Sequence, residues 1–332
     1  MAVNERKKRT KAVIDSFPKW VVRVYVVVLT VIFPFYERNQ YFSLLSDRTK
    51  FFKYCTSLMI LALSVFCIIQ IKKQGTVFLR HIRQKAENNK TILAFLGLFL
   101  LVFAFSTVCS EWKLLAWTGE AGRYQGLYMW LLYAAAFLCI LLYYRPGKID
   151  FAIFLLAGMV VCSWGIFDYL GYDWFEWHKK VKVGQRAMFM SSIGNINTFT
   201  AMAGIYFSTA GGYFIAAKEK FEYTDIICII SFILSGTAMF IGSSDNAAVG
   251  VLAFFLLLPF LAFRKKESSG RYFLLAAIFC CIFIIVYQIN IVSGSPYIDR
   301  QGGVLLRLCS IGGLLCRSSS YMFLCFRLYL SI

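Results

Sequence analysis

The sequence predicts an all-α, polytopic membrane protein, a transmembrane helical bundle of about nine spans with a cytoplasmic N-terminus. Of its 332 residues, 59% are hydrophobic and 18% are aromatic, and the mean hydropathy is +0.66. Soluble domains are roughly half apolar or less, so this composition excludes them. The apolar residues form runs separated by short basic connections. Every run is expected to be a helix, because a lone strand cannot satisfy its backbone in lipid.

The first apolar run, 20–35, follows a basic leader at residues 1–19. It is short, contains Arg23 and ends at Pro34 among aromatic residues, which is typical of an uncleaved anchor rather than a signal peptide. The other eight runs are 51–71, 91–109, 126–144, 151–170, 193–217, 226–242, 247–263 and 272–287. The predicted organisation is therefore a cytoplasmic leader at 1–19, a transmembrane domain at 20–290 and a C-terminal tail at 291–332.

The formal charge of +18 comes from 35 Lys and Arg against 17 Asp and Glu. A nucleic-acid binder can show such an excess, but here the basic residues lie in the connections between apolar runs, so they are interpreted as topology signals. With a cytoplasmic N-terminus, the connections carry 20 basic residues inside and 10 outside. This bias supports the inside N-terminus, and nucleic acid is not an expected partner.

The 11 cysteines lie mostly inside apolar runs, and their spacing shows no paired metal ligands. The adjacent pair Cys280 and Cys281 is their one cluster. They are interpreted as small apolar filler. The sequence therefore predicts neither a metal centre nor a cofactor.

Three connections on the predicted outer face are candidates for a substrate-binding or catalytic site. They are residues 111–127, 168–197 and 242–246. In the first, Gly119, Gly122 and Gly126 predict a bent loop. That loop would bring Arg123 to the membrane surface, where a guanidinium group can grip a phosphate through paired N–H donors. The alternative for each arginine is an interfacial anchor beside an aromatic belt.

Where the second connection meets the sixth apolar run, Arg186 precedes two serines that can cap a helix, Ser191 and Ser192. Asn195 and Asn197 then fall within the first turns of the predicted helix. Its unpaired N–H groups and positive dipole end suit an anion, and two arginines could together hold a diphosphate. The alternative is a capped helix whose amides pack against neighbouring helices.

Three motifs occur in order along these segments. GRYQGL (122–127) follows the third run, SSIGNINTFTAM (191–202) opens the sixth after Arg186, and GSSDNAAVG (242–250) opens the eighth. Together they resemble the bacterial O-antigen ligase and O-antigen polymerase family, over about residues 112–287. Each motif is short and degenerate, so their order, spacing and common outer location carry the resemblance.

The resemblance implies metal-independent, inverting glycosyl transfer at the outer face of the bacterial cytoplasmic membrane. The donor would be a glycan on an undecaprenyl-diphosphate carrier, and the acceptor a sugar hydroxyl on a lipid or polymer. Arg123 and Arg186 match the family's arginines for the donor diphosphate, with Asn195 and Asn197 as further substrate-binding candidates. Fixed cations can replace a metal in stabilising a departing diphosphate.

The chain departs from the family in two places. Asp245 follows the serines of the third motif where the family commonly has arginine, and its carboxylate would repel a diphosphate. The family's large outer loop, with a histidine near the acceptor, has no counterpart, because residues 291–332 are rich in Leu, Cys, Ser and Arg. Neither His81 nor His178 is assigned to its role, so the catalytic residue is unassigned.

The tail is interpreted as a truncated or out-of-frame end, and an inactive copy of the ligase or polymerase is one hypothesis that this leaves open; the alternative is a tenth span near 304–328. Two other functions stay open. A transporter or flippase of lipid-linked sugars would use charges inside spans, of which Arg23 is one. A non-catalytic membrane scaffold would need no outer loop. No oligomeric state is predicted.

Overall fold

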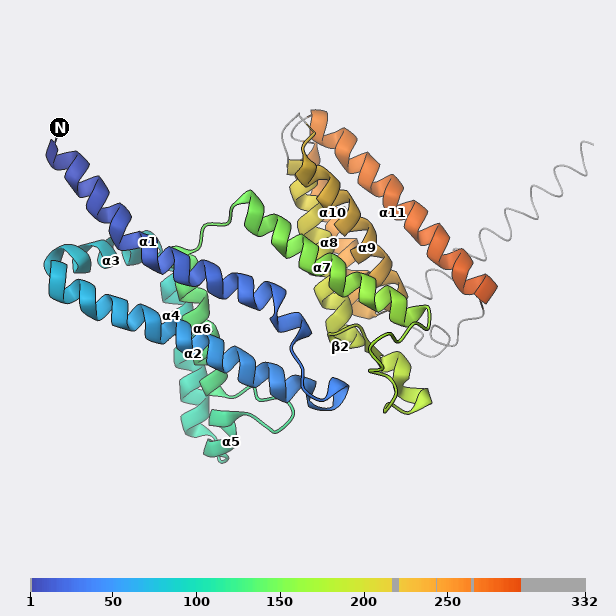
Figure 1. Cartoon of the computed structure of the whole chain (residues 1–332), viewed down its shortest axis with the longest axis horizontal. Coiled ribbons are helices and arrows are strands. Elements are labelled where there is room, and N and C mark those ends of the chain that lie inside the picture. The colour runs from blue at the N-terminus through green and yellow to red at the C-terminus, as the bar shows by residue number, and fades with distance from the viewer. Residues whose placement is uncertain (1, 217–220, 243, 264–265, 294–332) are drawn as a thin grey trace, which may run out of the picture. The chain divides into compact units, whose positions relative to one another are not determined.

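The structure, a computed structural model, describes residues 2–216, 221–242, 244–263 and 266–293 (Figure 1). Most of these residues are helical. The chain divides into two compact units, Met1–Asp150 and Phe151–Ile332, here called the N-terminal and C-terminal units. From residue 294 onward, the predicted tail at 291–332 lies outside the described residues.

The N-terminal unit is built on α1, which packs against α2 and α6. Its elements are α1 (Ala2–Val31), a short 3-10 helix (Phe33–Phe35), α2 (Gln40–Gln74), α3 (Thr76–Asn88), α4 (Lys90–Cys109), α5 (Lys113–Thr118) and α6 (Leu127–Tyr143). The core consists of Val22, Tyr25, Met59, Leu63, Ala136 and Tyr143. Helix α1 continues without a break through the predicted leader boundary at position 19.

An ion pair neutralises Arg23, the charge that the sequence places inside the first run. Its Nε donates to Oδ1 of Asp150 over 2.7 Å. The Asp150 side chain is 3% exposed and also accepts the N–H of Gly147. A buried carboxylate with a guanidinium partner is a sufficient structural reason for Arg23. This charge therefore does not need a transport pathway to explain it.

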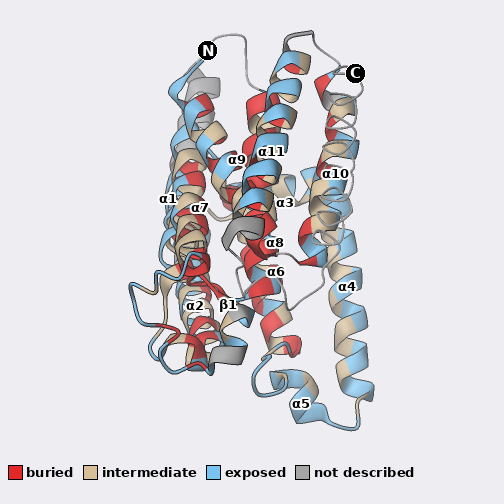
Figure 2. Ribbon diagram, turned by 90° about the vertical axis from the view of Figure 1, so that its right-hand side faces the viewer, coloured by how far each residue is buried: buried red, intermediate tan, exposed pale blue. Residues whose placement is uncertain are grey.

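The C-terminal unit is a helical bundle in which α8 packs against α9 and α10, and α11 packs against α9. Its elements are α7 (Lys148–Tyr169), a 3-10 helix (Val183–Met188), β1 (Phe189–Met190), β2 (Gly194–Asn195), α8 (Ile196–Ala216), α9 (Tyr223–Gly242), α10 (Asp245–Ala262) and α11 (Lys266–Ser293). Buried residues follow the length of α8 and α9 (Figure 2). These two helices form the core of the unit.

Two glycines of α7 let the aromatic side chains of α8 approach closely. A Cβ at Gly158 would lie 2.4 Å from the ring of Tyr206, and one at Gly165 would lie 2.3 Å from the ring of Phe199. Both rings are almost completely buried. Because these two glycines have no side chain, the rings pack directly against the backbone of α7. This close packing holds α8 against α7.

Each of the nine predicted apolar runs coincides with a helix of the structure. Within the described residues, six helical segments are long and apolar enough to cross a membrane. They are Ser16–Phe35, Gln40–Gln74, Lys90–Cys109, Lys148–Tyr169, Tyr223–Gly242 and Ser268–Gln288. The protein is thus a membrane-embedded helical protein, while the number of nine spans and the cytoplasmic N-terminus stay predictions.

Helix α8 is not among the six segments, for a physical reason. Thr, Ser, Gly and Tyr residues lower its hydropathy, and much of its surface is buried in protein rather than exposed to lipid. Helix α4 is the opposite case. None of its residues is buried, and Phe95 and Phe105 are about 70% exposed (Figure 2). Such a face suits lipid contact.

Helix α3 is not predicted by the hydropathy of the sequence. It lies in a connection whose basic residues, Arg80, Arg83 and Lys85 among them, count toward the predicted cytoplasmic side. In the structure it buries Phe78 and exposes Val77, Arg80 and Arg83, while Lys85 is half-buried over the ring of Tyr143. A basic amphipathic helix of this kind is typical of a membrane surface.

Candidate functional site

The connection between α7 and α8 is anchored at both of its ends. Asp168, in the last turn of α7, accepts the N–H of Ser191 on one carboxylate oxygen, Oδ2, over 2.7 Å. The hydroxyl of Ser191 donates to the carbonyl of Val161 over 2.7 Å. Ser191 is fully buried and has a φ of +58°, a conformation that these two hydrogen bonds help to hold. The chain therefore returns to the point where it left α7.

Ser191 and Ser192 do not cap a helix, which corrects the sequence-based prediction. They lie in the turn between β1 and β2, which pair Phe189 with Asn195 and Met190 with Gly194. The hairpin forms because the buried Ser191 is tied to α7 rather than to the next helix. Helix α8 consequently begins at Ile196, three residues later than predicted.

Asn195 caps α8. Its Oδ1 accepts the N–H groups of Asn197 at 2.9 Å and Thr198 at 3.4 Å. Two of the four amides at this helix start are therefore satisfied. Asn195 thus acts as a cap, while Asn197 is exposed at the same helix start and keeps an amide side chain for a ligand.

The start of α10 lies beside the start of α8. Ser244 caps α10, and its hydroxyl is 2.5 Å from the hydroxyl of Thr200 in the second turn of α8. The second and third predicted segments therefore come together, with two helix N-termini at one end of the unit. Asp245, in the first turn of α10, is exposed. Its charge suits the helix dipole and opposes a nearby anion.

Arg186 lies in the 3-10 helix that precedes β1. Its side chain is half-buried, and its Nε donates to the carbonyl of Val181 over 3.3 Å. Among the neighbouring lysines, Lys179 is paired with Glu176 at 2.9 Å, and this hydrogen bond raises the pKa of Lys179. Lys180 and Lys182 are exposed. The connection thus presents a cationic surface to which Arg186 contributes a half-buried guanidinium group.

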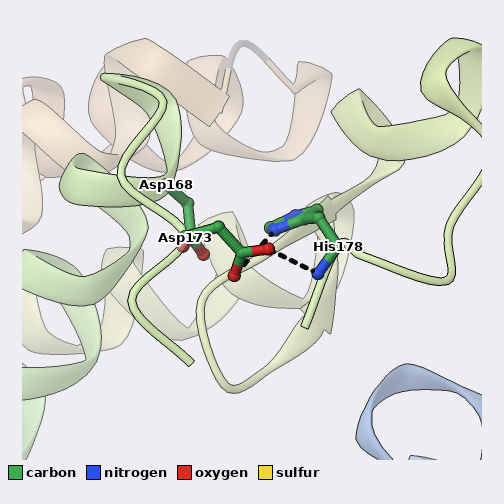
Figure 3. Close-up of side chains that lie close together, drawn as sticks. All are labelled: Asp168, Asp173 and His178. Carbon is green, nitrogen blue, oxygen red and sulfur yellow. Dashed lines mark hydrogen bonds and ion pairs between the residues drawn. The ribbon is translucent and has the colours of Figure 1, made fainter. Parts of the chain in front are cut away.

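Three ligand-type side chains gather under this connection, as Figure 3 shows. Asp168, Asp173 and His178 each offer a ligand atom, and these atoms all lie within 4.8 Å of one another. Nδ1 of His178 is 3.6 Å from Oδ1 of Asp173, and its Nε2 is 3.0 Å from the carbonyl oxygen of Phe189. Asp168 and His178 are buried.

Arg123 lies in the N-terminal unit, on the loop between α5 and α6. A Cβ at Gly119 would lie 2.3 Å from the backbone N of Gln125, and Gly119 has a φ of +82°. Only glycine therefore fits at this point, where the two ends of the loop approach each other. Arg123 is exposed and lines an open pocket of about 340 Å³, together with Glu120. The bent glycine loop of the prediction is confirmed.

The predicted site residues thus fall into two groups. Arg186, Asn195 and Asn197 lie around the α8 start of the C-terminal unit, and Arg123 lies in the other unit. That both arginines grip one diphosphate stays a prediction. Sequence reasoning did not connect Asp168 and Asp173 with His178. Their regular spacing of five residues after a membrane-length helix is the signal that points to them.

Comparison with known proteins finds no match for this chain among protein families, curated proteins or solved structures. The resemblance therefore rests on the three motifs themselves.

Proposed function

We propose that the protein transfers a glycan from an undecaprenyl-diphosphate carrier to a sugar hydroxyl at the outer face of the bacterial cytoplasmic membrane. This is the reaction implied by the resemblance to O-antigen ligases and polymerases. One observation carries the proposal: the starts of α8 and α10 lie side by side, joined by Thr200 and Ser244, at the end of the unit where the connection with Arg186 is anchored. A lipid-linked diphosphate is an anion that such an end would attract.

The chemistry needs positive charge at the leaving group. The acceptor oxygen forms a bond to the anomeric carbon of the donor sugar, and the bond from that carbon to the diphosphate oxygen breaks. The hydroxyl proton passes to a base or to water, and the released lipid diphosphate carries the added negative charge. The helix dipole at the start of α8 and the guanidinium group of Arg186 would stabilise that charge without moving, whereas Asp245 offsets the dipole of α10.

The length of α8 also supports the proposal. From Ile196 to Phe214, α8 is about 27 Å long at 1.5 Å per residue, close to the roughly 30 Å of a hydrocarbon core. The start of α8 therefore lies about one bilayer thickness from Phe214, near the other end of the same helix. A lipid headgroup would meet Arg186 and Asn197 at the membrane surface.

Replacing Arg186 by alanine is expected to slow glycan transfer by at least about tenfold, or 1.4 kcal/mol. The lost side chain is a charge-assisted donor to the departing diphosphate. Arg123→Ala is expected to have a similar effect if both arginines serve one donor. The measurement is transfer from an undecaprenyl-diphosphate oligosaccharide to a sugar acceptor by the purified chain in lipid nanodiscs, with binding of undecaprenyl diphosphate itself as a second readout.

Arg83→Ala is the matched control, because Arg83 is exposed, belongs to α3 and forms an i,i+4 pair with Glu87. It should leave both transfer and binding unchanged. The enzyme proposal fails if the intact chain neither binds the carrier nor transfers its glycan, which would favour a scaffold. Carrier binding with movement across the bilayer but no transfer would favour a flippase.

No described charge favours a transporter over the proposed transferase. Arg23 is paired with Asp150, and Arg271 is paired with Asp225 at 2.9 Å. Charges that line a pathway face water or bind cargo. Each of these two cations is instead paired with a buried carboxylate, of Asp150 or of Asp225, whose side chain is 3% or 1% exposed.

A further inference from the structure

The cluster of Asp168, Asp173 and His178 does not need the proposed transferase to explain it. It lies where the connection after α7 folds back on the helix, with ligand atoms from all three residues within 4.8 Å of one another (Figure 3). Asp168 and His178 are 7% and 8% exposed. One carboxylate and the imidazole are thus almost completely buried, and the Asp173 side chain beside them is 28% exposed.

The hydrogen bond at the far side of the imidazole orients His178. Its Nε2 lies 3.0 Å from the carbonyl oxygen of Phe189. A carbonyl only accepts hydrogen bonds, so Nε2 carries a proton. In the neutral ring, Nδ1 then directs its lone pair at Asp173, 3.6 Å away. Metal-binding histidines are commonly arranged in this way, with the second ring nitrogen donating to a backbone carbonyl.

Asp168 supplies an independent observation. Its Oδ2 accepts the N–H of Ser191, whereas its Oδ1 is buried and has no hydrogen-bond partner among the described residues. A buried carboxylate oxygen without a partner is unfavourable, and buried charges are normally paired or bound to a metal. A cation in the cluster would supply the missing partner.

Asp173 is positioned by its own loop. Its Oδ1 accepts the N–H of Trp177, and its Oδ2 accepts the N–H of His178, both over 2.9 Å. The carboxylate is therefore fixed before any ligand arrives, and it keeps further lone pairs on both oxygens. All three candidate ligands are thus held by hydrogen bonds to the backbone.

We propose that Asp168, Asp173 and His178 bind one divalent transition-metal ion of the zinc class. An imidazole favours Zn²⁺ over Mg²⁺ or Ca²⁺, and two carboxylates balance the charge of the ion. Ligands of a tetrahedral zinc ion lie roughly 3.3 Å apart, close to the 3.6 Å between Nδ1 of His178 and Oδ1 of Asp173. Asp168 would complete the site with a small closing movement.

The ion would fasten the connection to α7. Asp168 belongs to that helix, while Asp173 and His178 belong to the loop that leads to Arg186. The fourth zinc position would remain for water or another oxygen ligand. This inference is independent of glycan transfer, and it departs from the metal-independent chemistry that the resemblance implies.

The test is metal binding by the tag-free full chain in detergent micelles, after treatment with EDTA. Zn²⁺ is titrated by calorimetry, and Co²⁺ is used as a spectroscopic probe because thiolate ligands add a charge-transfer band that carboxylate and imidazole do not. One Zn²⁺ should bind per chain and raise the unfolding temperature. The Co²⁺ spectrum should show nitrogen and oxygen ligands without thiolate.

Asp168→Asn and His178→Ala should each weaken Zn²⁺ binding at least about tenfold and remove the rise in unfolding temperature. Asp168→Asn is nearly isosteric, so a folded variant without the metal effect separates binding from folding. His81→Ala, in the N-terminal unit, should leave binding unchanged. The proposal is wrong if the intact chain binds no Zn²⁺, if cobalt reports thiolate ligands, or if Asp168→Asn binds as tightly as the intact chain.

Discussion

Replacing Arg271 by methionine is expected to lower the free energy of unfolding by about 3–5 kcal/mol, the range for breaking a buried ion pair. Arg271 lies in α11, and its Nη1 donates to Asp225 Oδ1 at 2.9 Å and to the carbonyl of Phe214 at 2.8 Å. The Asp225 side chain is 1% exposed. Without the guanidinium group, a carboxylate would stay buried without its cation. Chemical unfolding of the purified chain in mild detergent measures the loss.

A second substitution tests the cause of that loss. Adding Asp225→Asn to Arg271→Met removes the unpaired charge and should recover much of the lost stability. The control is Arg83→Met, because Arg83 and Glu87 form an exposed pair whose side chains are 82% and 61% accessible. That substitution should change stability by less than about 1 kcal/mol. An equal loss in both single variants would show that burial does not determine the effect.

The two ends of the C-terminal unit differ in how their polar groups are paired. At one end, Arg271 of α11 donates hydrogen bonds to Phe214 at the end of α8 and to Asp225 at the start of α9. At the other end, the start of α8 carries the exposed Asn197, and Arg186 lies half-buried in the connection that leads there. The charges at the first end are neutralised by their partners, whereas the second end keeps the exposed amide of Asn197 and the half-buried guanidinium group of Arg186.

Hydropathy predicted the helices well, because each predicted apolar run coincides with a helix. It missed α3, since the basic residues of an amphipathic helix interrupt an apolar run in the same way as a loop does. It also gave no reason for α8 to be less apolar than its neighbours. The contacts that bury much of α8 in protein are not visible in a single sequence.

The site was less predictable than the fold, for a reason that Ser191 illustrates. Two serines before an apolar run are a normal helix-cap signal, yet Ser191 is bound by Asp168 and Val161, which precede it by 23 and 30 residues. Such long-range contacts override a local preference. The connection after α7 folds back on that helix and so brings His178 close to Asp168. The spacing of these two residues in the sequence does not by itself predict that they lie close together.

Replacing Gly242 by alanine is expected to destabilise the protein by about 3 kcal/mol, the upper end of the usual range for overpacking. Gly242 ends α9, and a Cβ there would lie 2.2 Å from the Cγ2 methyl group of Thr200. Relief of this overlap would move Thr200 away from Ser244 and separate the starts of α8 and α10. Unfolding in detergent and carrier binding in nanodiscs should both report the change.

A second substitution, Thr200→Ser, tests whether the overlap with Thr200 causes the loss of stability. It deletes the overlapping methyl group and keeps the hydroxyl that forms the hydrogen bond with Ser244. The Gly242→Ala, Thr200→Ser double variant should therefore regain most of the lost stability and bind undecaprenyl diphosphate as the intact chain does. Gly236→Ala is the control within the same helix, since a Cβ there would come no closer than 3.4 Å to Phe207. If the double variant stays as unstable as Gly242→Ala, the overlap with Thr200 is not the cause. If it recovers stability but not carrier binding, the paired helix starts are not where the diphosphate binds.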